Sequence, residues 1–339
     1  MQFVEKRSHC SGLIKVTGNF SELFAGHSSW FSYSSMLRIF KHYDFQVNNQ
    51  HTATRRHSFS SYPGLLSSLD DFYMMRDSGL VMVQTTNPII NKKIYSKVTH
   101  KSLLAWQRVR TANQMARTGE EWAQPIKWPN SGTYENQYMV VNMKLFSPGK
   151  ALPPGTLWVV EQIPGLVEFA DVTQQLERGY WPSYNVPYFP TIYNESGFKD
   201  ALEKFPTESN AALSGLQYQL APRAKIFRRD QGTVVDMDSY KAIMRYNDYK
   251  NDPYSDGNPM NAICSRGDLA GSAGGCYDTK VTSWSWFQNM HASIINGPTQ
   301  SHGLPAFHWD EQNGKYEDVA HEGQANLFNY DFQDEYFDE

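Results

Sequence analysis

A succession of short β-type runs, separated by turn-forming residues, most constrains the fold of this 339-residue chain. The run from Cys10 to Val16 alternates and predicts a strand that begins at the cysteine. Leu80 to Thr86 is a further β-rich run. Tyr138 to Leu145 and Thr156 to Gln162 also predict strands, and each is followed by a Pro-Gly turn. A chain of this kind needs β-sheet as its main element.

Fewer stretches predict helices. Between Ser32 and Tyr43, apolar residues recur at i, i+3, i+4 and i+7. Thr99 is a suitable N-cap for a helix to about Arg117, and another helix is expected from about Asp238 to Tyr249. Tyr180 to Pro190 carries three prolines and predicts a loop. Because there is no fixed-period repeat and no linker, the sequence predicts one mixed α+β domain with sheet packed against helices.

The charge balance excludes two classes of partner. The chain has 31 Lys plus Arg against 35 Asp plus Glu, a formal charge of −4. Nucleic-acid binders present a clustered basic face, so neither nucleic acid nor an anionic membrane surface is an expected partner. No apolar run approaches the roughly 18 residues of a membrane-spanning segment, and the start of the chain shows no signal peptide. Aromatic residues make up 14% of the chain, which suits a dense core, a ligand cleft or both.

The common cofactor motifs do not occur in the sequence. There is no phosphate-binding loop ending in Lys-Ser/Thr and no dinucleotide fingerprint. The histidines near the end of the chain lack the spacing of metal ligands: His291, His302, His308 and His321. The sequence therefore predicts neither a metal nor another cofactor.

Three cysteines leave one without a partner if two of them pair. Cys264 and Cys276 lie in one Gly-rich loop. Closing a loop of about 13 residues contributes on the order of 3 kcal/mol in an oxidising compartment. Two free thiols in a flexible loop are the alternative, and the disulfide is the preferred interpretation. Cys10 then remains alone.

Cys10 heads the first expected strand, and its role has more than one interpretation. A lone cysteine commonly serves as a small buried apolar residue. If the chain were cut between His9 and Cys10, one residue would carry both the thiol and a free α-amine, which could take the thiol proton near neutral pH. N-terminal nucleophile hydrolases use this arrangement, in which the nucleophile and its base belong to the same terminal residue. A serine esterase using Ser28 is a further alternative, because Gly26-His27-Ser28-Ser29-Trp30 begins like a nucleophile elbow, although Trp30 replaces its last glycine.

The sequence around Cys10 resembles the nucleophile segment of the phospholipase B-like family, lysosomal proteins related to lamina ancestor. The resemblance spans Cys10 to about Trp309 and rests on many blocks in the same order. The blocks are HCSGLIKVTGNFSELFAGHSSWFSYSSMLRIFKHYDF, Ser60 to Gly64, Asp70 to Tyr73, Gln84 to Asn87, Tyr188 to Gly197, Ala221 to Asp230, Asn247 to Tyr249, the Cys264 to Cys276 loop and Gly297 to Thr299.

The resemblance implies an αββα sandwich of the N-terminal nucleophile hydrolase type, made as a precursor that cleaves itself just before the cysteine. Residues 1–9 would then be a remnant of the upstream segment, and residues 10–339 the catalytic domain. Family members carry a signal peptide and a long segment before the cysteine, which supplies part of the sandwich. We therefore expect the sandwich of this chain to be incomplete at its N-terminal side.

The resemblance also implies roles for individual residues. Cys10 takes the nucleophile position, and Asn194 matches the asparagine that stabilises the oxyanion. Either Arg228 or Arg229 matches the site arginine, with Arg228 preferred. The remaining site residues are His27 as a catalytic residue, and Trp30, Asp44, Tyr62 and either Thr85 or Thr86, with Thr86 preferred, as substrate-binding residues.

The implied activity is hydrolysis of ester or amide bonds of lipid-like substrates, first of all phospholipid acyl chains, in the lysosome or outside the cell. An acyl-amide hydrolase and a catalytically silent binding or structural homologue are the alternatives. If Asn194 is a buried oxyanion donor, Asn19 is the better glycosylation site of the two sequons. The expected partners are the substrate and the N-terminal fragment of the same precursor, and a homodimer is compatible with the resemblance.

Overall fold

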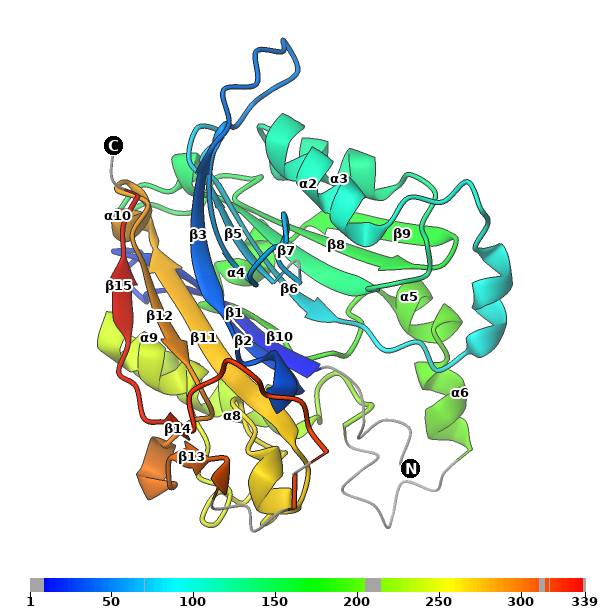
Figure 1. Ribbon diagram of the computed structural model, residues 1–339. Helices are drawn as coiled ribbons and strands as arrows, with labels where there is room; N and C mark the ends of the chain where they lie inside the picture. The colour runs from blue at the N-terminus through cyan, green and yellow to red at the C-terminus, as the bar shows by residue number, and fades with distance from the viewer. Residues whose placement is uncertain (1–8, 70, 205–214, 311–314, 317, 338–339) are drawn as a thin grey trace.

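The computed structural model describes residues 9–69, 71–204, 215–310, 315–316 and 318–337. Residues 1–8, which form most of the expected upstream remnant, and Asp70 lie outside the described residues. Two antiparallel sheets dominate the fold (Figure 1). The first has the order β10-β1-β2-β11-β12-β15. Its strands are β1 (His9–Val16), β2 (Leu23–Ser32), β10 (Tyr180–Ser183), β11 (Gly274–Ser283), β12 (Ala292–Asn296) and β15 (Gln333–Glu335).

The second sheet is a meander in which each strand pairs with the next one along the chain. Its strands are β3 (Ile39–Asp44), β4 (Arg56–Ser61), β5 (Phe72–Met75), β6 (Leu80–Thr86), β7 (Asn136–Asn142), β8 (Leu157–Ile163) and β9 (Leu166–Asp171). The strands expected at 80–86 and 156–162 are therefore confirmed as β6 and β8. The strand expected at 138–145 is found as β7, but it ends at Asn142 and a 3-10 turn, Met143–Leu145, follows. A separate two-stranded sheet joins β13 (Phe307–His308) to β14 (Leu327–Phe328).

The two large sheets pack face to face, and helices cover their outer faces (Figure 1). Ile14 and Ala25 from the first sheet meet Val83 and Met139 from the second in a fully buried apolar core. The first sheet is covered by α8 (Pro222–Asp230) and α9 (Met237–Met244), and the second by α2 (Ala105–Met115) and α3 (Gly119–Ile126). These four layers confirm the predicted α+β sandwich.

The prediction of a helix between Ser32 and Tyr43 is wrong. A short 3-10 turn, Tyr33–Ser35, is followed by strand β3, which pairs along its length with β4. The apolar periodicity was therefore overridden by pairing with the next strand along the chain. The expected loop from Tyr180 begins instead with strand β10, whose Pro182 is tolerated because β10 is an edge strand.

The other helices are shorter than predicted. The helix expected from Thr99 begins at Ala105 and ends at Met115, and the helix expected to reach Tyr249 ends at Met244. The remaining helices are α4 (Thr173–Leu176), α5 (Pro190–Glu195), α6 (Phe198–Glu203) and α10 (Trp284–Phe287). Within the described ranges, none of the helices is both long enough and apolar enough to span a bilayer.

The predicted disulfide between Cys264 and Cys276 is confirmed, and both residues are fully buried. It joins the loop before β11 to that strand and packs against Trp30. We expect the pair of substitutions Cys264→Ser and Cys276→Ser to lower the free energy of unfolding by about 3 kcal/mol, because the loop is then open in the unfolded chain. Chemical denaturation of both proteins measures the difference, and an unchanged midpoint would contradict the estimate.

Candidate active site

The space between the sheets changes from apolar to polar at the end where β1 begins. Residues of β1 with even numbers face the second sheet, since a Cβ on Gly12 would touch Met139. Cys10 therefore shares its face with Ile14. On the antiparallel neighbour β2, His27 and the buried Ser29 lie at the same end, and Ser29 pairs directly with Cys10. The thiol thus sits at the polar end of the space between the sheets.

Two residues distant in sequence hold the main chain of Cys10. The Cys10 nitrogen donates to Asn185 Oδ1 at 3.0 Å. The Arg223 guanidinium donates to the Cys10 carbonyl oxygen, and its Nη2 donates to Asn185 Oδ1 at 2.8 Å. Asn185 is itself fixed, because its Nδ2 donates to the Thr86 carbonyl oxygen at 2.7 Å and its φ is +69°, a left-handed conformation that asparagine tolerates. We call this pair the Asn185–Arg223 cradle.

Burial sets the protonation of Cys10. The side chain is 5% exposed, and burial raises the pKa of its thiol to about 11. Burial also lowers the pKa of Arg223 to about 9, and the guanidinium stacks over the Trp30 ring at 4.3 Å. In the uncleaved chain the thiol is therefore protonated at neutral pH, beside a cationic group that favours its ionised form.

A cluster of four buried charges lies deeper between the sheets. Asp71 Oδ2 accepts from Arg38 Nη2 at 2.7 Å and from Lys280 Nζ at 2.8 Å. Asp278 accepts from the same two cations, at 2.9 Å from Arg38 and 2.7 Å from Lys280. Burial raises the pKa of both carboxyl groups, but Lys280 and Arg38 outweigh it and hold both pKa values below their usual range. We call these residues the ionic cluster.

The donor atoms of His27, Asp71 and Asp278 lie within 4.8 Å of one another, as the ligands of a metal ion would. The Lys280 ammonium is within 3.1 Å of an atom of each of them. The position between these three side chains is thus taken by a protein cation, and the arrangement does not fit a metal ion.

The structure does not bring three of the implied site residues to Cys10. Asn194 is exposed in α5 instead of buried as an oxyanion donor. Arg228 is exposed, and Arg229 forms surface ion pairs. Asp44 is exposed at the end of β3 and accepts from Gln46. These assignments are corrected as follows: the asparagine and arginine beside Cys10 are Asn185 and Arg223, and the carboxylate beside His27 is Asp71.

Local geometry explains these differences. Arg223 and Arg228 are five positions apart on α8, which places them roughly 140° apart around the helix. Strand alternation likewise separates Thr85 from Thr86: Thr85 is fully buried, faces Gly12 of β1 and bonds to Ser183 Oγ at 2.6 Å, whereas the Thr86 carbonyl accepts from Asn185. Asn185 lies in the segment predicted as a loop, and no sequence motif distinguishes it from other loop asparagines.

The remaining implied residues lie near the site or on the opposite face of β2. Trp30 is buried, with its ring against Arg223. Tyr62 bonds to the Tyr277 hydroxyl at 2.7 Å and lies under Arg38, so it borders the ionic cluster. Ser28 is fully buried on the helix side, where its hydroxyl donates to the Met244 carbonyl at 2.8 Å. That position does not suit a serine nucleophile.

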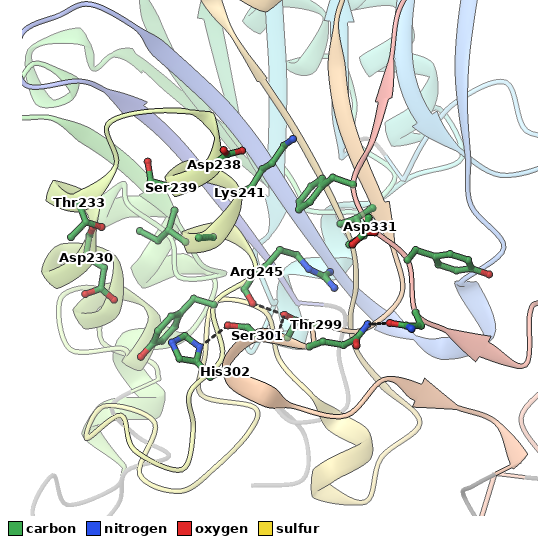
Figure 2. Close-up of a pocket in the computed structure, with 18 of the residues that line it drawn as sticks. Asp230, Thr233, Asp238, Ser239, Lys241, Arg245, Thr299, Ser301, His302 and Asp331 are labelled. Carbon is green, nitrogen blue, oxygen red and sulfur yellow. Dashed lines mark hydrogen bonds between the residues drawn. The ribbon is translucent and has the colours of Figure 1, made fainter.

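One cavity lies away from this site. It has a volume of about 970 Å³ and lies between α9 and residues 329–332, on the outer side of the first sheet (Figure 2). The residues that line it include Arg245, Thr299, Ser301 and His302. Cys10 does not belong to the described residues that line this cavity. This cavity therefore does not locate the chemistry, and the assignment of the site rests on Cys10 and its neighbours.

The protein is a layered α+β protein in which two facing sheets lie between layers of helices. A buried cysteine lies at the start of an inner strand, and the Asn185–Arg223 cradle surrounds it. The protein therefore has a thiol site at one end of its sheets. A family model described as Phospholipase B matches residues 1–335. The chain belongs to the phospholipase B family.

Individual relatives agree with this assignment. The chain is 51% identical over 327 residues to phospholipase B-like 1 of Rattus norvegicus, covering 96% of this chain and 57% of the relative. It is 50% identical to phospholipase B-like 1 of Homo sapiens and 48% identical to phospholipase B of Crotalus adamanteus, each over 327 residues with the same coverage. The chain thus spans a little over half the length of these relatives.

Proposed function

We propose that this chain carries the nucleophile of a thiol hydrolase of the N-terminal nucleophile type, acting on ester or amide bonds of lipid-like substrates. The observation that carries the proposal is the Asn185–Arg223 cradle around Cys10. Cleavage before Cys10 would turn its main-chain nitrogen into an α-amino group that Asn185 Oδ1 already accepts from at 3.0 Å. The names of the relatives, phospholipase B and phospholipase B-like 1, support a phospholipid acyl ester as the substrate.

Self-cleavage would use the same groups. The Cys10 sulfur attacks the His9 carbonyl carbon, the peptide C–N bond breaks, and the departing nitrogen receives the thiol proton. Water then hydrolyses the thioester, which releases the upstream carboxylate and regenerates the thiol. Because burial raises the pKa of the uncleaved thiol to about 11, proton transfer has to accompany the attack.

In the processed protein, the α-amine of Cys10 takes the thiol proton and later delivers it to the leaving oxygen or nitrogen of the substrate. Asn185 orients that amine through its side-chain oxygen. Arg223 holds Asn185 and the Cys10 carbonyl, and its positive charge favours the thiolate. The catalytic geometry would therefore depend on contacts between three distant parts of the chain.

Two further features support the proposed setting in the lysosome or outside the cell. The disulfide between Cys264 and Cys276 is typical of oxidising compartments. The sequon at Asn19 lies exposed in the turn between β1 and β2, where a glycan can be attached. Asn194 is also exposed, so its sequon is equally accessible.

Two substitutions on the same helix test the cradle. Arg223→Gln is expected to slow self-cleavage and hydrolysis by about 100-fold, because a small misplacement of reacting groups costs that much. Arg228→Gln is the matched control and should leave both rates unchanged, since Arg228 is exposed and donates its hydrogen bonds to Gln219. Time courses of cleavage by mass spectrometry measure the effect. Equal rates for the two variants would refute the role of the cradle.

A substrate panel tests the bond class. The full-length protein, after cleavage before Cys10, is assayed on diacyl phospholipids, lysophospholipids and N-acyl amides of matched chain length. The proposal expects release of fatty acid from at least one class, with the phospholipids as the leading candidates. If a processed protein with an accessible Cys10 thiol hydrolyses none of them, the proposed function fails and the silent homologue is the better interpretation.

A further inference from the structure

The ammonium group of the buried Lys280 contacts four polar side chains. The residue is 2% exposed, on β11 between the sheets. Besides Asp71 and Asp278, its ammonium donates to Ser29 Oγ at 2.8 Å and lies 3.1 Å from His27 Nδ1. Lys280 therefore links the ionic cluster to a histidine on the strand next to Cys10.

The ionic cluster leaves His27 uncharged. Lys280 and Arg38 are balanced by Asp71 and Asp278, so the described residues leave no unpaired carboxylate in the cluster to stabilise an imidazolium. Burial, with the Lys280 charge, lowers the pKa of His27 to about 3. At neutral pH the imidazole therefore carries one proton, on one of its two nitrogens.

The neighbour of each nitrogen decides which one carries that proton. An ammonium can only donate, so the His27 Nδ1 that faces Lys280 has to accept. The proton of the neutral ring must then lie on Nε2. Nε2 is buried and has no hydrogen-bond partner among the described residues, so its N–H is left without an acceptor there.

We propose that Lys280 is a positioning residue that holds His27 as a neutral imidazole with its proton on Nε2, while Asp71 and Asp278 hold Lys280. The Lys280 ammonium thus lies between His27, Asp71 and Asp278, where a metal ion bound by these three side chains would lie. Its ammonium orients the histidine as a bound metal or a second-shell carboxylate does in other sites.

The catalytic consequence of this inference rests on the proposed function. His27 pairs with Gly12 and lies on the face that carries Cys10, one diagonal step away across the two strands. A neutral Nε2–H on that face would donate to the substrate carbonyl oxygen as negative charge develops. His27 would therefore act as a hydrogen-bond donor, and the α-amine of Cys10 would remain the base.

The full-length protein labelled with ¹⁵N-histidine tests the tautomer without any substrate. The His27 signal is identified by its loss in His27→Gln, and its ¹⁵N shifts distinguish a protonated from an unprotonated ring nitrogen. We expect Nε2 protonated, Nδ1 unprotonated and no titration between about pH 5 and 8, where an ordinary histidine changes charge. A proton on Nδ1, or titration near the ordinary value, would overturn the inference.

Lys280→Met then tests the cause. Without the ammonium, Asp71 is the nearest charge, with its Oδ2 4.0 Å from His27 Nδ1, so the pKa of His27 should rise by more than about one unit. Thr279→Val is the matched control, because Thr279 is fully buried on the opposite face of β11 and bonds to Ser28. It should leave the His27 signal unchanged. An identical His27 tautomer and titration in Lys280→Met and wild type would refute the role of Lys280.

The same spectra recorded on Cys10→Ala separate this inference from the proposed function. That variant lacks the proposed nucleophile but keeps the ionic cluster, so His27 should show the same tautomer as in the wild type. If His27 behaves as expected in a protein that never cleaves and hydrolyses nothing, the inference stands and the proposed function fails. If the protein is an active hydrolase but His27 carries its proton on Nδ1, the inference alone fails.

Discussion

Cys10→Ala is expected to abolish cleavage before residue 10 and to reduce hydrolysis by at least about 1,000-fold, because no other group at the site replaces the sulfur nucleophile. The substitution removes one sulfur atom from a buried position and keeps the strand pairing of β1. Intact-mass measurement of the full-length protein shows whether a fragment begins at Cys10 or whether the peptide bond between His9 and Cys10 is intact. Fatty-acid release from phospholipid measures the second effect.

Ser28→Ala is the control for this prediction. Ser28 lies on the neighbouring strand but on its opposite face, where its hydroxyl bonds to the Met244 carbonyl and to Thr279. We expect this variant to cleave and to hydrolyse at the wild-type rate, with a stability loss of about 1 kcal/mol from the lost hydrogen bonds. An intact chain in both Cys10→Ala and wild type would contradict the mechanism. If Ser28→Ala loses hydrolysis while Cys10→Ala keeps it, the alternative hypothesis of a serine esterase is favoured.

Asp71→Ala is expected to lower the free energy of unfolding by about 3–5 kcal/mol. Among the described residues, the substitution leaves Lys280 and Arg38 buried with Asp278 as their one paired carboxylate, and an uncompensated buried charge is strongly destabilising. Urea denaturation measures the change in midpoint. Asp44→Ala is the control, because Asp44 is exposed and should change stability by no more than about 0.5 kcal/mol.

The same ionic cluster predicts how stability depends on pH. Lys280 and Arg38 hold the pKa values of Asp71 and Asp278 below those of the unfolded chain, which are about 3.9. Their contribution is thus fully present above about pH 4 and is lost as the pH falls through the lower folded values. Asp71→Ala should flatten this acid dependence. A stability difference between the variant and wild type that is the same at acid and neutral pH would contradict the assignment.

Several features could be predicted from the sequence because they depend on short segments. The alternation from Cys10 to Val16 predicts a strand that starts at the cysteine, and the structure has it as β1, which begins one residue earlier at His9. The pairing of Cys264 with Cys276 follows from two cysteines in one loop. Repeated short strands with few helices indicate an α+β sandwich, and the two packed sheets agree. Each of these inferences uses residues that are near neighbours in the chain.

The sequence by itself thus determined the class of fold, the strand that bears Cys10 and, by resemblance, the family. The tertiary structure alone decided which residues surround the thiol. Asn185 and Arg223 reach Cys10 across 175 and 213 residues of chain, and Lys280 reaches His27 across 253. Local patterns report which face of an element is buried, but they do not report which element packs against that face. That choice is made when the two sheets pair and pack, and it selected Asn185 over Asn194 and Arg223 over Arg228.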